Sequence, residues 1–252
     1  METTLDAFLG GRLTIEQPNA RHHRAGLDAV FLAAAADPPP DALVADLGAG
    51  VGTAGLCLAA RRPDVRLQLV ERDPDLAALA RANLMRNGPE GGHEVVEADI
   101  LAGATALADA GLAANAADMA IVNPPFYKRS ETRASPKAPR AAAHVLEGGG
   151  LDAWIRCAAH LVKARGQLVL IFPAAGLAEC LGALGRRFGG GAILPLHPRP
   201  GRPASKIVLV AHKGRRAAPE LLPGLVLHPE TGNAFSPAAE AILRCGQALP
   251  MA

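Results

Sequence analysis

Aromatic residues and cysteines are scarce in this sequence. Aromatic side chains make up 3% of its 252 residues, while half of the residues are hydrophobic. The core must therefore be filled by Ala, Leu, Val and Ile. The four cysteines, Cys57, Cys157, Cys180 and Cys245, form no CxxC pair and lie in apolar helical patterns. This pattern predicts buried thiols and argues against disulfides and a zinc site or any other metal site.

Long uninterrupted apolar runs are also missing. Residues 1–10 contain no cationic segment followed by an apolar stretch, so we expect no signal peptide. The Ala-rich stretch 101–122 is interrupted by Asp109 and Asp118, which argues against a membrane span there. The sequence therefore predicts a cytoplasmic protein without a membrane partner.

Charge is nearly balanced overall but unevenly distributed, with a formal net charge of +2. Residues 1–150 hold 14 Lys and Arg against 19 Asp and Glu, whereas residues 151–252 hold 12 against 5. Such asymmetry suits an acidic cofactor half joined to a basic surface that meets phosphates. Ordinary solvated surface charge is the alternative interpretation.

Strand-length apolar runs alternate with helix-length stretches rich in Ala and Leu. The runs lie at 42–47, 66–71, 93–98, 118–122 and 166–172, and the longest helical stretches at 53–62, 74–87 and 151–165. This alternation predicts a parallel sheet with crossover helices. Two further runs, 191–197 and 206–212, have no helix between them and should pair antiparallel. The sequence therefore predicts an α/β fold with a seven-stranded, mostly parallel sheet and an antiparallel terminal strand pair.

Two helices have clear end signals. Asp73 is a predicted N-cap, Pro74 lies in the first turn, and Asn87-Gly88 is a stop signal, which together predict a helix over 74–87. Ser236-Pro237 predicts the start of a short C-terminal helix.

The first predicted strand runs into a glycine-rich turn, Asp46-Leu47-Gly48-Ala49-Gly50-Val51-Gly52. Without side chains, the backbone of such a turn can approach a ligand at a helix N-terminus. Gly50, Gly52 and Gly55 also satisfy GxGxxG, so a nicotinamide- or flavin-binding protein is an alternative. Asp46 favours a methionine moiety, because its carboxylate can address an amino group and would serve a pyrophosphate poorly.

Acidic residues recur at the ends of the next two predicted strands. Glu71 can accept both hydroxyls of a ribose, and such charge-assisted bonds are worth roughly 1.5–3 kcal/mol each. Asp99 and Ile100 are expected to flank an adenine ring, with Asp99 at its amino group and Ile100 on its face. Together with Asp46 and the neighbouring Arg72, these residues predict a site for S-adenosylmethionine.

The fourth predicted strand ends in Asn123-Pro124-Pro125-Phe126. An exocyclic amine has its lone pair delocalised into the ring and must be oriented before it attacks a sulfonium methyl. The Asn123 oxygen and the carbonyl before a proline can both accept bonds from the NH₂ group. Phe126 can stack on the base, a contact worth about 1–3 kcal/mol. These four residues are the predicted catalytic set, with Asn123 also facing the cofactor; a proline-rich turn without chemistry is the alternative.

At DLGAGVG, VERDP and NPPF the sequence resembles the class I, Rossmann-like methyltransferases that carry a (D/N)PP(Y/F/W) signature. They modify adenine, guanine or cytosine amines, or the amide of glutamine. Within that group, residues 10–35 look like the bacterial enzymes that methylate adenine N6 beside the anticodon of a valine tRNA. The matched positions are Gln17, Pro18, Arg24, Gly26, Asp28 and Ala29. The resemblance implies that segment 12–30 closes over the cofactor, with Arg24 and Asp28 in its site.

A length of 252 residues is within the range of one large α/β domain. We therefore expect one domain over 1–252, with an N-terminal lid and helix (1–40), a Rossmann-like core (41–212) and a C-terminal extension (213–252). One departure is Phe126, where many relatives have Tyr; Tyr127 follows it. Stacking survives this change.

The basic residues after the NPPF motif predict an RNA acceptor, and the resemblance implies that this acceptor is the anticodon loop of a tRNA. Besides Phe126 and Tyr127, the predicted substrate contacts are basic residues that suit phosphates: Lys128, Arg129, Arg133 and, in the terminal hairpin, Arg202. A protein glutamine, or an amine in DNA or ribosomal RNA, is the alternative. Enzymes for those acceptors carry additional or duplicated domains, whereas 45 residues precede Asp46 here.

Overall fold

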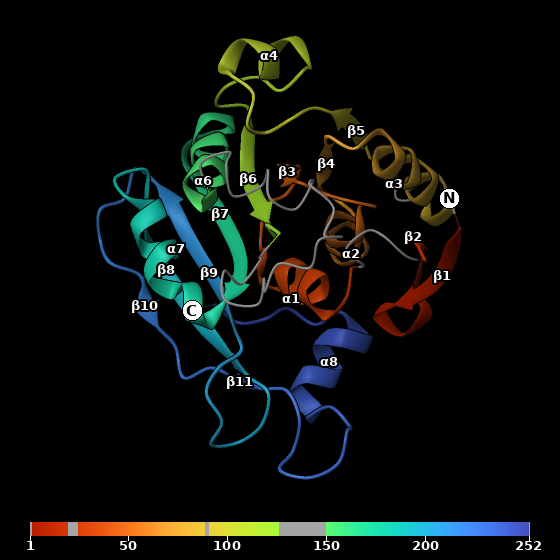
Figure 1. The fold of residues 1–252 in the computed structure, drawn as a ribbon, viewed down its shortest axis with the longest axis vertical. Coiled ribbons are helices and arrows are strands. Elements are labelled where there is room, and N and C mark those ends of the chain that lie inside the picture. Colours follow the sequence, from red (N-terminus) through yellow and green to blue (C-terminus); the bar gives the residue numbers. More distant parts are fainter. Residues whose placement is uncertain (1, 20–24, 89–90, 126–149, 252) are drawn as a thin grey trace, which may run out of the picture.

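A central β-sheet dominates the computed structural model, which describes residues 2–19, 25–88, 91–125 and 150–251. Its strands are β3 (Leu43–Leu47), β4 (Arg66–Glu71), β5 (Glu94–Glu97), β6 (Ala117–Val122), β7 (Val162–Pro173), β8 (Phe188–His197), β9 (Lys206–Lys213), β10 (Glu220–Leu221) and β11 (Leu225–Val226). The order is β10-β8-β9-β7-β6-β3-β4-β5, and β11 also pairs with β8 (Figure 1).

The strand directions confirm the predicted sheet. Strands β5, β4, β3, β6 and β7 are parallel, and β9 is antiparallel to both β7 and β8. The seven predicted strands are all present. Strands β10 and β11 add to them by pairing parallel to β8, and because each has two residues, neither leaves an apolar period in the sequence.

Helices cover both faces of this sheet. Helices α1 (Leu27–Ala35), α2 (Thr53–Arg61), α3 (Pro74–Asn87) and α8 (Pro237–Cys245) pack on one face, and α4 (Ala104–Asp109), α6 (Gly150–Leu161) and α7 (Leu177–Leu184) on the other. Successive residues of a strand point to opposite faces, so Val44 and Ala45 belong to different cores. In the part of the chain that the structure describes, no helix is long and apolar enough to cross a membrane.

A separate β-hairpin precedes the sheet. Strand β1 (Thr3–Phe8) pairs antiparallel with β2 (Leu13–Pro18), and the hairpin lies beside α3 (Figure 1). Leu13 and Ile15 of β2 are buried in the core under α2 and α3. Only a lid and a helix are expected in this region from the sequence, so the hairpin was not predicted.

Helix ends confirm the capping signals and correct one boundary. The Asp73 carboxylate accepts from the Asp75 and Leu76 N–H groups at 2.9 and 3.2 Å, and Gly88 ends α3 with φ 51°. The helix predicted over 151–165 ends at Leu161, so its last residues were placed wrongly. Val162 instead begins β7, where it pairs with Ala117 of β6.

An ion pair also holds the start of β7, since the Lys163 ammonium lies 2.7 Å from the Asp118 carboxylate.

The helix predicted from Ser236-Pro237 is α8, and the Ser236 hydroxyl accepts from the Ala239 N–H group. Three of the cysteines are buried as predicted, whereas Cys245 at the end of α8 is exposed, which corrects that prediction.

Candidate functional site

The candidate site lies at the carboxyl edge of the parallel strands. Strand β3 lies between β4 and β6, and Leu47 is in register with both Val70 and Val122. Glu71 and Asn123 therefore occupy equivalent positions on the two sides of the turn that follows β3. With strands about 4.8 Å apart, their backbones are roughly 10 Å from one another across that turn.

The glycine turn presents open backbone at this edge. Gly48 has φ 68°, and a Cβ built on it would lie 2.5 Å from the ring of Trp154 of α6, so only glycine fits beneath that side chain. Gly50 has φ 56°, but a Cβ there would meet no atom within 4 Å. The space above Gly50 is thus open to a ligand. Gly52, two residues further on, is the N-cap residue of α2.

Glu71 holds the glycine turn against the end of β4. One carboxylate oxygen accepts from the Gly50 N–H group at 2.8 Å, and the other accepts from the Arg72 and Asp73 N–H groups at 2.9 Å each. A carboxylate has about four acceptor positions, so Glu71 retains capacity for one further donor beside Gly50. Its side chain is 8% exposed, whereas that of Arg72 lies at the surface.

Asp46 lies beneath the turn rather than above it. It is 2% exposed, and its carboxylate accepts from the N–H group of Gly55, in the first turn of α2, at 2.9 Å. Burial raises the pKa of Asp46 to about 7; the Gly55 bond opposes this rise and the charge of Glu71 adds to it. A cation above the turn would favour the charged form. The direct contact with an amino group stays a prediction.

The end of β5 adjoins this arrangement. The Ala98 N–H group donates to the Glu71 carbonyl at 3.1 Å, which brings Asp99 beside the end of β4. Asp99 is exposed, and one of its carboxylate oxygens accepts from the Leu101 N–H group at 2.9 Å. Ile100 is 7% exposed and packs in the core with α4 and α6. The structure thus gathers Asp46, Glu71 and Asp99 around one turn.

The predicted catalytic motif begins at the end of β6. Asn123 is half-buried, Pro124 is buried and Pro125 is exposed. Because β6 is paired on both sides, with β3 and β7, the position of Asn123 is set by the centre of the sheet. The predicted residues Phe126, Tyr127, Lys128, Arg129 and Arg133 lie outside the described residues, as does Arg24.

Asp28 lies in the first turn of α1 and forms an ion pair that the sequence did not indicate. Its carboxylate is 2.5 Å from the ammonium of Lys206, which opposes Pro173 at the end of β7. Asp28 therefore lies by β7, on the far side of Asn123 from Glu71. Arg202 is exposed in the loop between β8 and β9. Over the described ranges, no group of His, Cys, Asp or Glu is arranged to bind a metal.

Comparison with known families decides what this edge belongs to. The methyltransferase small domain model matches residues 24–172, which hold the glycine turn, Glu71 and Asn123. The chain belongs to this methyltransferase family. The finding confirms the predicted family, and it covers the strands that carry the candidate site.

Individual proteins that are similar to this chain are also methyltransferases by name. The chain is 32% identical over 172 residues to a tRNA1(Val) (adenine(37)-N6)-methyltransferase of Porphyromonas gingivalis, covering 67% of this chain and 65% of that protein. It is 28% identical to the enzyme of the same name from Histophilus somni, covering 60% and 61%. The matches thus span less than two thirds of these relatives. A predicted O-methyltransferase structure from Agrobacterium tumefaciens aligns with TM-score 0.74 and 32% identity over 88% of this chain and 98% of that one, which confirms the Rossmann-like methyltransferase fold.

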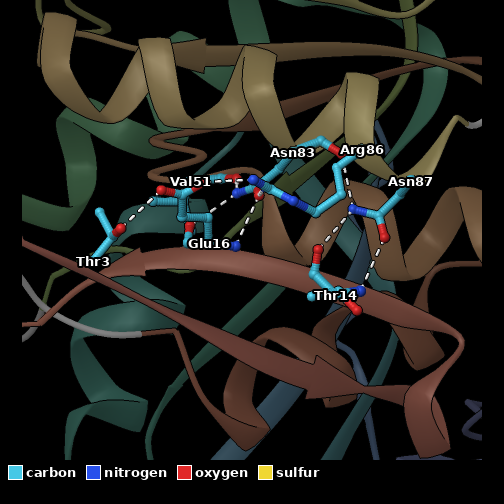
Figure 2. A network of polar contacts seen from close by, with 7 residues as sticks. All are labelled: Thr3, Thr14, Glu16, Val51, Asn83, Arg86 and Asn87. Carbon is cyan, nitrogen blue, oxygen red and sulfur yellow. Dashed lines mark hydrogen bonds and ion pairs between the residues drawn. The ribbon is translucent and has the colours of Figure 1, made fainter.

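Two asparagines of α3, Asn83 and Asn87, bind strand β2, which the sequence did not indicate (Figure 2). The Asn87 side chain accepts from the Thr14 N–H group at 2.9 Å and donates to the Thr14 carbonyl at 3.0 Å. The Asn83 side chain makes the same pair of bonds with Glu16 at 2.8 and 3.0 Å. It is fully buried and also donates to the carbonyl of Val51 in the glycine turn at 3.0 Å. Asn83 therefore joins the β1–β2 hairpin to the glycine turn.

The signal for these asparagines was present in the sequence. Asn is a poor helix former because its side chain competes for backbone groups, yet Asn83 and Asn87 lie one turn apart in the middle and at the end of α3. Gln17 of β2, which the sequence analysis names only as a family match, also has a structural role. It is 1% exposed, and its amide accepts from the Ala25 N–H group at 2.8 Å and donates to the Asp6 carboxylate at 2.9 Å. It fixes the chain just before α1.

Proposed function

We propose that this protein transfers a methyl group from S-adenosylmethionine to an exocyclic amino nitrogen, N6 of adenine in a tRNA. One observation carries the proposal: Asn123-Pro124 leaves the sheet directly beside the glycine turn, whose opposite side is closed by Glu71. A donor held on the turn and an acceptor held by Asn123 would lie side by side.

The residues present fit S-adenosylmethionine. The open backbone at Gly50 admits the ligand, and the remaining acceptor capacity of Glu71 suits a ribose hydroxyl. Glu71 and Asp99 place negative charge at this edge, which favours a cationic ligand and disfavours the pyrophosphate of a nicotinamide or flavin cofactor. When bound, S-adenosylmethionine supplies an electrophilic methyl group on a sulfonium.

Asn123 favours nitrogen as the atom that is methylated. Its amide oxygen can accept from an NH₂ group and direct the lone pair, but an amide is no base and cannot take the proton of a hydroxyl. With S-adenosylmethionine bound, the nitrogen oriented by Asn123 would bond to the methyl carbon as the carbon–sulfur bond breaks, and would then lose one proton to water. Phe126 would stack on the base and hold it in this orientation.

Adenine in tRNA is supported by the relatives' names and by charge. Four matched relatives, including the two described above, are named tRNA1(Val) (adenine(37)-N6)-methyltransferase. In addition, residues 151–252 carry 12 Lys and Arg against 5 Asp and Glu. We propose that Tyr127, Lys128, Arg129 and Arg133 contact the anticodon loop, and that the protein acts in the cytoplasm.

The test is incubation with radiolabelled S-adenosylmethionine and, separately, total bacterial RNA, DNA and protein. The proposal predicts label in RNA, recovered as N6-methyladenosine after nuclease digestion, and almost none with Asn123→Ala. Label in protein glutamine would support the glutamine alternative and overturn the proposed acceptor. Label in a hydroxyl or carboxyl oxygen would overturn the role of Asn123.

A further inference from the structure

A second pocket lies far from the candidate site, where α7 ends and β8 begins. It has a volume of about 300 Å³, at the lower end of the range for ligand pockets. Leu184 and Phe188 line it as buried apolar residues, and Arg186, Arg215 and Arg216 line it as exposed ones. We call it the arginine pocket.

Its positive charge is not neutralised by the surrounding chain. Among the residues that the structure describes, no acidic one lines the arginine pocket. The side chains of Arg186, Arg215 and Arg216 form no hydrogen bond or ion pair with any residue that the structure describes, whereas the neighbouring Arg187 lies 2.8 Å from the Asp152 carboxylate. Burial and the charge of Arg215 lower the pKa of His212 nearby. The pocket is therefore suited to an anion.

Its position relates it to the candidate site through the sheet. Asn123 is level with Ile171 of β7, which pairs with Val208 of β9, and Phe188 of β8 pairs with Lys213 at the opposite end of β9. Standard strand spacing and rise place the pocket roughly 20 Å from Asn123. A small substrate at Asn123 cannot reach that far, but an RNA can.

The chemistry of the pocket selects the ligand. A guanidinium binds phosphate through two parallel hydrogen bonds and stacks on planar rings. Leu181 also lines the pocket and is 43% exposed, so it offers an apolar surface to the face of an unstacked base. Acidic peptides share the charge but do not need this apolar surface beside the arginines. We propose that the arginine pocket binds a nucleotide of the substrate RNA outside the methylated loop. The proposal rests on the proposed function insofar as the acceptor is RNA.

The experiment measures binding of the full-length protein to a complete tRNA transcript and to its isolated anticodon stem-loop. The test variant is Arg186→Gln with Arg216→Gln. The matched control is Arg156→Gln with Arg244→Gln, which removes the same charge from exposed i,i+4 ion pairs on α6 and α8. Calorimetry with S-adenosylmethionine and thermal unfolding show whether each variant is folded.

The test variant should weaken binding of the complete transcript by about tenfold and make its log–log salt slope less negative by roughly 1 to 1.5, as expected for two lost phosphate contacts. Binding of the stem-loop and of S-adenosylmethionine should stay within about twofold of wild type, as should all values for the control. Equal losses in the test and control variants would show diffuse attraction and overturn the proposal. Unchanged binding in the test variant would overturn it too and leave an acidic protein partner as the alternative. If the wild type binds the transcript but methylates only protein or DNA, the proposed function fails separately.

Discussion

The two halves of the carboxyl edge are built in different ways. At the ends of β3, β4 and β5, the carboxylates of Asp46, Glu71 and Asp99 each accept a bond from a backbone N–H group. Beyond β6, the corresponding contact is the ion pair of Asp28 and Lys206, whose side chains are 29% and 32% exposed and come from opposite ends of the chain. The first half is fixed by hydrogen bonds to the backbone, and the second by an ion pair between half-buried side chains.

This difference suggests a division of labour. Backbone-held carboxylates are already oriented before a ligand arrives, so the first half should bind the cofactor without RNA. A half-buried ion pair at the edge of the sheet is partly screened by water, so its charges can be exchanged for others, which suits a surface that meets phosphates. Variants in the first half should therefore change cofactor affinity, and variants in the second half should change RNA-dependent steps.

The largest expected effect is on kcat and comes from replacing Asn123, which should leave cofactor binding by the first half unchanged. Asn123→Ala should lower kcat by about 10²–10³-fold, because it removes the acceptor that orients the amine. The cofactor Kd should stay near the wild-type value. Single-turnover kinetics with calorimetry check both. A variant that kept most of its activity would contradict the amine mechanism.

Glu71→Ala should have the next largest effect, and on the cofactor alone. Losing a charge-assisted bond of roughly 1.5–3 kcal/mol should weaken S-adenosylmethionine binding by about 10- to 100-fold. Calorimetry without RNA measures this. The RNA Kd serves as the control, and preference of the wild type for NADH would refute the cofactor assignment.

Asn83 and Asn87 offer a matched pair within the first half. Both Asn83→Ala and Asn87→Ala lose two bonds to β2 and should lower the free energy of unfolding by about 1–3 kcal/mol. Only Asn83 also bonds to the glycine turn, so only its variant should weaken cofactor binding, by about fivefold, as expected for one neutral bond. Equal cofactor affinities in two folded variants would restrict Asn83 to holding the hairpin.

The smallest expected effect concerns pH and Asp46. Because burial raises its pKa to about 7 in the folded chain, the native state favours the protonated carboxyl, and its contribution to stability is lost as pH rises through that value. Relative to Asp46→Asn, the wild type should lose roughly 1 kcal/mol between about pH 6 and pH 7. Urea unfolding at each pH measures this, and parallel curves for the two proteins would contradict the assigned pKa.

The sequence predicted the features that depend on neighbours in the chain. Alternating runs gave the parallel strands, and the cap at Asp73 and the stop at Gly88 gave the bounds of α3. The carboxyl edge followed, because parallel strands end at one side of a sheet. Glu71, the last residue of β4, and Asn123, which follows β6 directly, thus both lie at that edge.

The features that the sequence did not predict depend on distant partners. The β1–β2 hairpin is docked by Asn83 and Asn87, which lie about seventy residues further along the chain. Lys206 pairs with Asp28 across 178 residues, a contact that no local pattern in the sequence indicates. The start of β7 at Val162 likewise depends on pairing with β6, which outweighs a local helical pattern.

The central claim is that Asn123 presents adenine N6 of a tRNA to the methyl donor. The most direct measurement uses two tRNA1(Val) transcripts, identical except for adenine or guanine at position 37, the position in the relatives' names. Wild-type protein and S-adenosylmethionine should yield N6-methyladenosine, detected by mass spectrometry after nuclease digestion, from the adenine transcript only. Equal methylation of both transcripts, or of neither, would contradict the account.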